Sequence, residues 1–210
     1  MKSIFRTFNL PNTAGLVLLA LLAGGCRTGD LVDLERAIPH LRLDIRYATT
    51  NNFTGQQLYP EARCFLRRAP AKKLRAVQAE LARSGLGLKI FDGYRPLSVQ
   101  RKMWAVFPHP GYVADPRKGS RHNRGAAVDV TLICLADGQE LLMPTPYDDF
   151  TERAHRNFMA LPAEAIRNRE QLEQVMRRHG FEGLPTEWWH FDATDWKSYP
   201  LLDVEIPPRR

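Results

Sequence analysis

The chain has 210 residues and a formal net charge of +7, with 44% hydrophobic and 25% charged side chains. This composition excludes a disordered tail, and the three cysteines exclude a disulfide-rich scaffold. The length predicts one domain of about 150 residues or more, or two small ones, with a core large enough to fold without a metal or a disulfide.

The first 25 residues resemble a signal for export. Lys2 and Arg6 give a basic start, a short apolar stretch (LVLLALLA) follows, and two glycines precede Cys26. A secretory signal has this order of features, and the cysteine resembles the lipobox of bacterial lipoproteins. We expect residues 1–25 to be removed and Cys26 to become the lipidated mature N-terminus. Residues 26–210 would then form an exported periplasmic or cell-envelope domain, with the lipid as its only membrane contact. An ordinary signal peptide with a coincidental cysteine is the alternative.

The remaining positive charge is scattered in short pairs such as Arg67-Arg68, without interleaved aromatic residues. A nucleic-acid-binding surface would concentrate basic residues on one face, so we expect no nucleic-acid partner. In an oxidising compartment Cys64 and Cys134 could pair, but the sequence does not show whether they meet.

The first half of the mature chain predicts two helices and a strand between them. Residues 70–84 place apolar side chains on one face and are followed by Gly85, which predicts an amphipathic helix. Residues 86–91 alternate and predict a strand. Ser98 is expected to cap a second helix.

The second half predicts strands at residues 126–132 and 187–192 (EWWHFD). Between them, Asn168 followed by Gln171 resembles a capping box for a helix that runs to Arg178. Because helices and strands mix without regular βαβ spacing, we expect an α+β fold.

Residues able to carry chemistry gather in three segments. The first includes His122 and Asp129, whose carboxylate lies in an apolar strand and would be costly to bury without a cation or strong donors. The second contains Glu187 and His190, and the third (DGYRP) offers Arg95. Two histidines and one aspartate can hold a catalytic zinc ion whose fourth position is left for water.

Glu187 is our candidate for the base that accepts a proton from that water, and Arg95 would stabilise an oxyanion. In a regular strand Glu187 and His190 would face opposite sides, so the segment must bend, and Pro185 and Thr186 favour a bend. Each residue alone has a simpler explanation, such as a surface histidine, a turn-capping aspartate or an aromatic core strand. The patterns by themselves indicate only a possible metal-dependent hydrolase.

Together the segments resemble the zinc D-alanyl-D-alanine dipeptidases, relatives of the VanX type in the LAS group of peptidases. The shared pattern Ser-x-His-x-x-Gly-x-x-x-Asp, with a downstream Glu-x-Trp-His in loose form, matches residues 120–129 and 187–190. Residues 44–53 (DIRYATTNNF), 91–96 (FDGYRP) and 146–150 (PYDDF) further indicate the dipeptidase branch. The resemblance covers most of the mature chain.

This resemblance implies one zinc ion per chain on His122, Asp129 and His190. It implies that Glu187 is the general base and acid, and that Arg95 stabilises the transition state. The implied fold is a compact single α+β domain in which a central antiparallel sheet carries the zinc site and helices pack around it.

Ser120, Tyr47 and Asp148 match positions expected to line a small substrate pocket and to help hold the ammonium group of a dipeptide. Asp149 adjoins Asp148, and either carboxylate could face the pocket. The sequence does not indicate the oligomeric state or the preferred side chains of the dipeptide.

The implied activity is hydrolysis of D-Ala-D-Ala to two D-alanines. An exported enzyme cannot reach the cytoplasmic dipeptide, so we expect a role in peptidoglycan turnover. The alternatives are a D,D-carboxypeptidase or peptidoglycan endopeptidase with the same metal centre in an open groove, and a non-catalytic lipoprotein that binds wall peptides. The presence of Glu187 argues against the last, because a pure binder needs no general base.

Overall fold

The computed structural model describes residues 30–209. The expectations for residues 1–25 and for Cys26 therefore lie outside the described residues. Between residues 30 and 209, no helix is both long enough and apolar enough to cross a membrane. Cys64 and Cys134 are free thiols, so no disulfide joins them.

The described chain contains short strands, four α-helices and several single turns of 3₁₀ helix. In chain order these are β1 (Leu31–Asp33), α1 (Leu34–Ala37), β2 (Arg42–Leu43), η2 (Arg46–Ala48), β3 (Phe65–Arg67), α2 (Arg68–Ala82), β4 (Leu86–Asp92), α3 (Leu97–Val106), η3 (His122–Arg124), β5 (Ala127–Cys134), η4 (Glu152–Ala154), α4 (Ala163–Arg178), β6 (Phe181–Gly183), β7 (His190–Ala193) and η5 (Trp196–Ser198).

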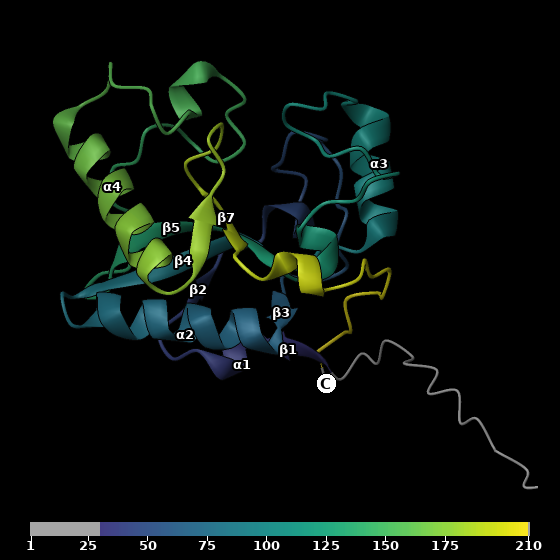
Figure 1. The fold of residues 1–210 in the computed structure, drawn as a ribbon, viewed down its shortest axis with the longest axis horizontal. Helices are drawn as coiled ribbons and strands as arrows, with labels where there is room; N and C mark the ends of the chain where they lie inside the picture. Colours follow the sequence, from purple (N-terminus) through teal and green to yellow (C-terminus); the bar gives the residue numbers. More distant parts are fainter. Residues whose placement is uncertain (1–29, 210) are drawn as a thin grey trace, which may run out of the picture.

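A five-stranded sheet in the order β2-β4-β5-β7-β6 forms the centre of the fold, and β1 pairs with β3 in a small second sheet. Helices α2 and α4 pack against the large sheet, whereas α3 lies across β7 from α4 (Figure 1). The expected mixture of helices and strands is confirmed. The sheet is antiparallel except at β2, which runs parallel to β4. This exception is possible because the chain between β2 and β4 is long and includes α2, as parallel neighbours require.

Strand β5 is buried over residues 127–133 and separates the apolar core from the polar face of the sheet. Val128, Val130 and Leu132 are fully buried in one hydrophobic cluster with Leu74 of α2. Because side chains alternate along a strand, Asp129 points to the opposite face. The apolar layer therefore fixes β5 in register and presents Asp129 on the other side.

The predicted helices exist, but two of their starting points are wrong. Helix α2 matches the predicted residues 70–84 closely. Helix α3 begins at Leu97 with Pro96 at its cap, and the Ser98 backbone NH donates to the Asp203 carboxylate, 2.7 Å away. A carboxylate from the C-terminal segment thus performs the capping that we expected of Ser98.

Helix α4 begins at Ala163, directly after Pro162, and includes Asn168 well inside it. Proline suits a helix start because its φ angle is already helical and its missing NH is not needed there. The Asn168 side chain donates instead to the carbonyl of Leu142, at 2.9 Å. The predicted capping box is therefore wrong, although the helix ends at Arg178 as expected.

Two of the three predicted strands correspond to β4 and β5 within two residues. The third was expected over residues 187–192, but β7 begins only at His190. Residues 185–189 form a bend between β6 and β7, which determines how Glu187 is placed.

Candidate metal centre

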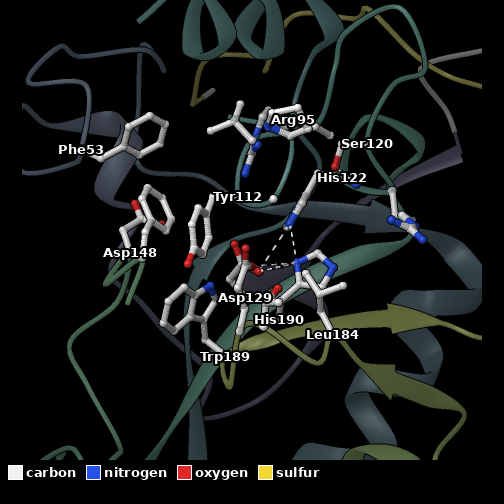
Figure 2. Close-up of a pocket in the computed structure, with 18 of the residues that line it drawn as sticks. Phe53, Arg95, Tyr112, Ser120, His122, Asp129, Asp148, Leu184, Trp189 and His190 are labelled. Atoms are coloured by element: carbon white, nitrogen blue, oxygen red, sulfur yellow. Dashed lines mark hydrogen bonds and ion pairs between the residues drawn. The ribbon is translucent and has the colours of Figure 1, made fainter. Parts of the chain in front are cut away.

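His122, Asp129 and His190 converge on one point beneath a surface cavity (Figure 2). His190 Nδ1 lies 3.0 Å from Asp129 Oδ1 and 3.1 Å from His122 Nε2. His122 Nε2 lies 3.4 Å from Asp129 Oδ1. All three side chains are buried. The structure thus brings together the three residues that the sequence nominated as ligands.

Backbone pairing explains why these distant residues meet. Asp129 of β5 and His190 of β7 are directly opposite each other in the antiparallel ladder, so their side chains share one face of the sheet. His122 lies in η3, whose C-cap is Gly125 with φ +66°, two residues before β5 begins. The buried Asn123 side chain accepts from the Ser120 NH and donates to the Arg95 carbonyl, which ties this turn to the chain after β4.

The donor set fits a zinc ion. His122 Nδ1 donates to the Gly93 carbonyl at 2.7 Å, and His190 Nε2 donates to Asp192 at 2.9 Å. With their outer nitrogens donating, the two imidazoles can each offer the lone pair of the other nitrogen to a metal ion, and Asp129 adds a carboxylate oxygen. Bonds of 2.0–2.1 Å in a tetrahedral zinc site place neighbouring ligand atoms about 3.3 Å apart, close to the spacings observed.

The electrostatics of the cluster favour a positive charge at its centre. Burial opposes ionisation of Asp129, but His122 and His190 outweigh it and hold the pKa of that carboxyl well below its usual range. Burial lowers the pKa of His190, yet Asp192 and Asp129 raise it to about 10. The buried carboxylates of Asp129 and Asp192, together with the two imidazoles, are a suitable environment for a divalent cation.

Glu187 lies beside the cluster because its segment bends. Its NH donates to the Leu184 carbonyl, and the Leu184 NH donates to the His190 carbonyl, which closes the connection between β6 and β7. Its Oε2 atom is 3.9 Å from His190 Nδ1, so Glu187 and His190 face the same site although they are three residues apart. Burial raises the pKa of the Glu187 carboxyl to about 7. A carboxyl with such a pKa can accept and return a proton near neutral pH.

Arg156 holds this bend in place, and no pattern in the sequence indicates this role. Its guanidinium donates to the carbonyls of Leu184, Trp188 and His190 at 2.9–3.0 Å and lies over the Phe191 ring. Burial lowers the pKa of Arg156 to about 10, which still leaves it charged at neutral pH. One arginine therefore fixes the backbone on both sides of Glu187.

Arg95 reaches the cavity from the chain after β4 and is fixed by Asp92. Its Nε and Nη2 atoms donate to Asp92 Oδ2 at 3.0 and 2.7 Å, and Nη1 donates to Gln100 at 2.9 Å. Burial by itself lowers the pKa of Arg95, but Asp92 raises it well above the usual value. These bonds use three of the five guanidinium donors, so two remain for a ligand in the cavity.

A β-bulge places Asp92 where it can do this. Ile90 pairs with Val130, but Asp92 pairs with Asp129, so Phe91 is an extra residue in β4. Without the bulge Asp92 would pair with Val128 and face the apolar core. Asp92 belongs to the third segment identified in the sequence, but its contact with Arg95 depends on this irregularity.

Tyr47, Ser120 and Asp148 line the same cavity, which has a volume of about 160 Å³. The Tyr47 hydroxyl donates to Asp148 Oδ2 at 3.0 Å. Asp149 instead accepts from the Thr151 NH, so Asp148 is the carboxylate that faces the cavity. Ser120 Oγ accepts from the His122 NH at 3.2 Å. In Figure 2, Ser120 and Asp148 lie on opposite sides of the cluster.

The surroundings of Asp148 disfavour a negative charge on its carboxyl. Its φ angle is +61°, a conformation that aspartate tolerates better than most residues but which is still uncommon. Burial, together with the negative charges of Asp129 and Glu187, raises the pKa of its carboxyl well above the usual value. A bound ammonium group would relieve this unfavourable charge.

Aromatic side chains from separate loops wall the cavity. Phe150 packs edge-on against Phe53 with ring centroids 5.4 Å apart, and it stacks on Tyr112 at 4.9 Å. Trp189 completes the lining near the cluster. These contacts join three loops around a small space.

Comparison with known proteins identifies relatives of the chain. A family model described as D-ala-D-ala dipeptidase matches residues 27–205. The D-alanyl-D-alanine dipeptidase of Escherichia coli is 41% identical over 179 residues, covering 83% of this chain and 90% of its own. The enzyme of that name from Enterococcus faecalis is 32% identical, with coverages of 80% and 92%. A solved vancomycin-resistance D,D-pentapeptidase, VanY, in complex with Zn(II) is 15% identical with a TM-score of 0.40, covering 64% of this chain and 75% of that chain.

Replacing Arg156 with methionine should destabilise the fold and reduce activity. Three carbonyls lose a charged donor, so we expect the free energy of unfolding to fall by about 2–4 kcal/mol in urea denaturation. Arg153→Met is the control, because Arg153 is exposed on η4, and it should change stability by less than about 0.5 kcal/mol. Equal stability of the two variants would contradict the role assigned to Arg156.

Proposed function

The chain belongs to the D-Ala-D-Ala dipeptidase family and is a zinc metallopeptidase, and we propose that it hydrolyses D-Ala-D-Ala to two D-alanines with one zinc ion held by His122, Asp129 and His190. The proposal is carried by one observation. A cavity of about 160 Å³ has the ligand cluster on its floor and the Tyr47–Asp148 pair on its wall. A cavity of this size suits a dipeptide of two small residues.

When bound, zinc would lower the pKa of a coordinated water toward about 7 and polarise the scissile carbonyl. Glu187 accepts a proton from the attacking water at its carboxylate and returns it to the leaving amine as the C–N bond breaks. The two unused Arg95 donors stabilise the negative charge that develops on the carbonyl oxygen. Asp192 and the Gly93 carbonyl keep the two histidines oriented throughout.

Asp148 and Tyr47 hold the dipeptide's ammonium group and so select free dipeptides. Asp148 has only a phenolic donor from Tyr47 in the described chain, which leaves carboxylate lone pairs for a positively charged partner. A substrate whose amino group is acylated brings no charge to this carboxylate. Phe53, Tyr112, Phe150 and Trp189 wall the cavity, which favours a small substrate. These features favour a dipeptidase over a carboxypeptidase or endopeptidase, which would need an open groove.

The proposal includes the location of the enzyme. The basic start, the apolar stretch and Cys26 support export and lipid anchoring, with action in the periplasm or cell envelope. In that compartment the dipeptide would come from peptidoglycan that has already been broken down. The enzyme would therefore serve turnover of the wall.

Two variants should show that the metal ligands and the general base have different roles. Glu187→Gln should lower kcat at least about 100-fold, because general base catalysis is lost, while zinc content measured by atomic emission stays at one per chain. His122→Ala should lose the zinc itself. Glu182→Gln serves as the control, since Glu182 is exposed on β6. Near-normal turnover by Glu187→Gln would sink its assignment as the base.

Free D-Ala-D-Ala should be preferred to N-acetyl-D-Ala-D-Ala by at least about 1,000-fold in kcat/KM, because the acylated substrate leaves the half-buried Asp148 carboxylate without a positively charged partner. Asp148→Asn should lower kcat/KM chiefly for the free dipeptide, so the preference for free over acylated substrate should decrease. Steady-state kinetics on both substrates test the prediction. A preference for the acylated compound would instead support the carboxypeptidase.

Lipidation can be tested by expressing the full chain in a bacterial host with labelled palmitate. The wild-type chain should carry label and sediment with membranes, whereas Cys26→Ser should do neither. Cys134→Ser removes a cysteine that is not proposed to be lipidated and should behave as the wild type. Recovery of an unprocessed wild-type chain in the cytoplasm would contradict the proposed location.

A further inference from the structure

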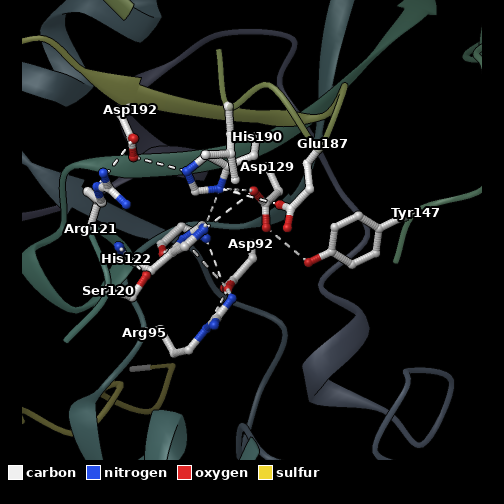
Figure 3. Close-up of polar contacts among 12 residues, drawn as sticks. Asp92, Arg95, Ser120, Arg121, His122, Asp129, Tyr147, Glu187, His190 and Asp192 are labelled. Carbon is white, nitrogen blue, oxygen red and sulfur yellow. Dashed lines mark hydrogen bonds and ion pairs between the residues drawn. The ribbon is translucent and has the colours of Figure 1, made fainter. Parts of the chain in front are cut away.

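The hydroxyl group of Tyr147 lies between the metal-ligand cluster and the Tyr47–Asp148 pair. It donates to Asp129 Oδ2 at 3.0 Å and lies 3.3 Å from the Tyr47 hydroxyl. Figure 3 shows it approaching Asp129 from the side opposite to Asp192. The catalytic roles described above do not use this hydroxyl.

The two oxygens of Asp129 have separate partners. Oδ1 faces both imidazoles, at 3.0 Å from His190 Nδ1 and 3.4 Å from His122 Nε2. Oδ2 accepts the Tyr147 proton. A carboxylate held in this way offers one defined oxygen to a metal ion, and its rotation is opposed by the hydrogen bond.

The Tyr147 ring is fixed independently of its hydroxyl. It stacks on Phe91 with ring centroids 4.5 Å apart and an interplanar angle of 19°. It also packs edge-on against Trp189, with centroids 5.5 Å apart. Phe91 is the extra residue of the β4 bulge, so the same irregularity that places Asp92 also supports this ring. A phenylalanine at position 147 could keep both contacts and lose only the oxygen.

The two phenols join two carboxylates. Each phenol has one proton, and the shortest contacts give the Tyr147 proton to Asp129 and the Tyr47 proton to Asp148. Removal of the Tyr147 oxygen would deprive Asp129 Oδ2 of its donor but leave the bond between Tyr47 and Asp148 in place. The effect should therefore fall on the metal ligand rather than on the ammonium site.

We propose that Tyr147 is a positioning residue for Asp129, which holds the ligand carboxylate in the orientation that binds zinc through one oxygen. The inference rests on the metal ligands assigned in the proposed function. Tyr147 lies in the motif at residues 146–150, but neither that motif nor the comparisons assign it a role.

Tyr147→Phe tests the proposal through zinc affinity, which is measured on the full chain by competition with a chromophoric chelator. Removal of a partner that orients a metal ligand typically weakens metal binding 10–100-fold, and we expect a loss in this range. At saturating zinc, kcat for D-Ala-D-Ala should fall, while KM should stay within about two-fold because Tyr47 and Asp148 are retained. The visible spectrum of the cobalt-substituted variant should also differ from that of the cobalt-substituted wild type.

Tyr199→Phe is the matched control. It too removes a phenol that donates to a carboxylate, since the Tyr199 hydroxyl donates to Asp195 at 2.7 Å, but Tyr199 does not line the cavity. Zinc affinity should be unchanged in this variant. Thermal unfolding of both variants without metal checks that each is folded.

Equal zinc affinity in Tyr147→Phe and the wild type would overturn the role of Tyr147 alone. A wild-type chain that binds no zinc would overturn the metal assignment and this inference together. A wild-type chain that binds zinc but does not cleave D-Ala-D-Ala would contradict the proposed activity, and the zinc measurement would still decide the role of Tyr147.

Discussion

The antiparallel register between β5 and β7 is the constraint on which the site depends. It places Asp129 and His190 opposite each other, and the fully buried residues on the other face of β5 prevent that register from slipping. A shift of one residue would turn Asp129 into the apolar core, where its charge would be uncompensated. The stability of the core and the geometry of the cluster are therefore two consequences of the same pairing.

The site must also balance an excess of buried negative charge. Each carboxylate has a different partner, and the partner determines its chemistry. Asp92 is neutralised by Arg95, and Asp129 is stabilised by imidazoles that could share a metal ion. Glu187 and Asp148 lack a full ion pair, and burial raises the pKa of both. These are the two carboxyls that we propose interact with the substrate. Glu187 accepts and returns a proton, and Asp148 contacts the ammonium group.

The residues that could be found from the sequence are those in compact motifs. His122 and Asp129 are seven positions apart, and Glu187 and His190 are three apart, so local pattern and chemistry were enough to nominate them. The bend that brings Glu187 and His190 to one side was also expected from Pro185. Helix starts were missed where a distant group supplies the cap, as Asp203 does for α3. The parallel placement of β2 depends on sheet order, which short motifs do not encode.

Arg156 and Tyr147 escaped prediction for a related reason, because their roles depend on where loops pack. Arg156 binds backbone carbonyls, which every residue type has, so the sequence around its partners contains no indication of the contact. Tyr147 depends on the bulge at Phe91, which places an aromatic platform beneath its ring. In both cases a rigid contact made elsewhere fixes a group that must not move, namely the Glu187 backbone and the Asp129 carboxylate. Precise placement of reacting groups requires such support, so these supporting residues should tolerate substitution less well than their distance from the substrate suggests.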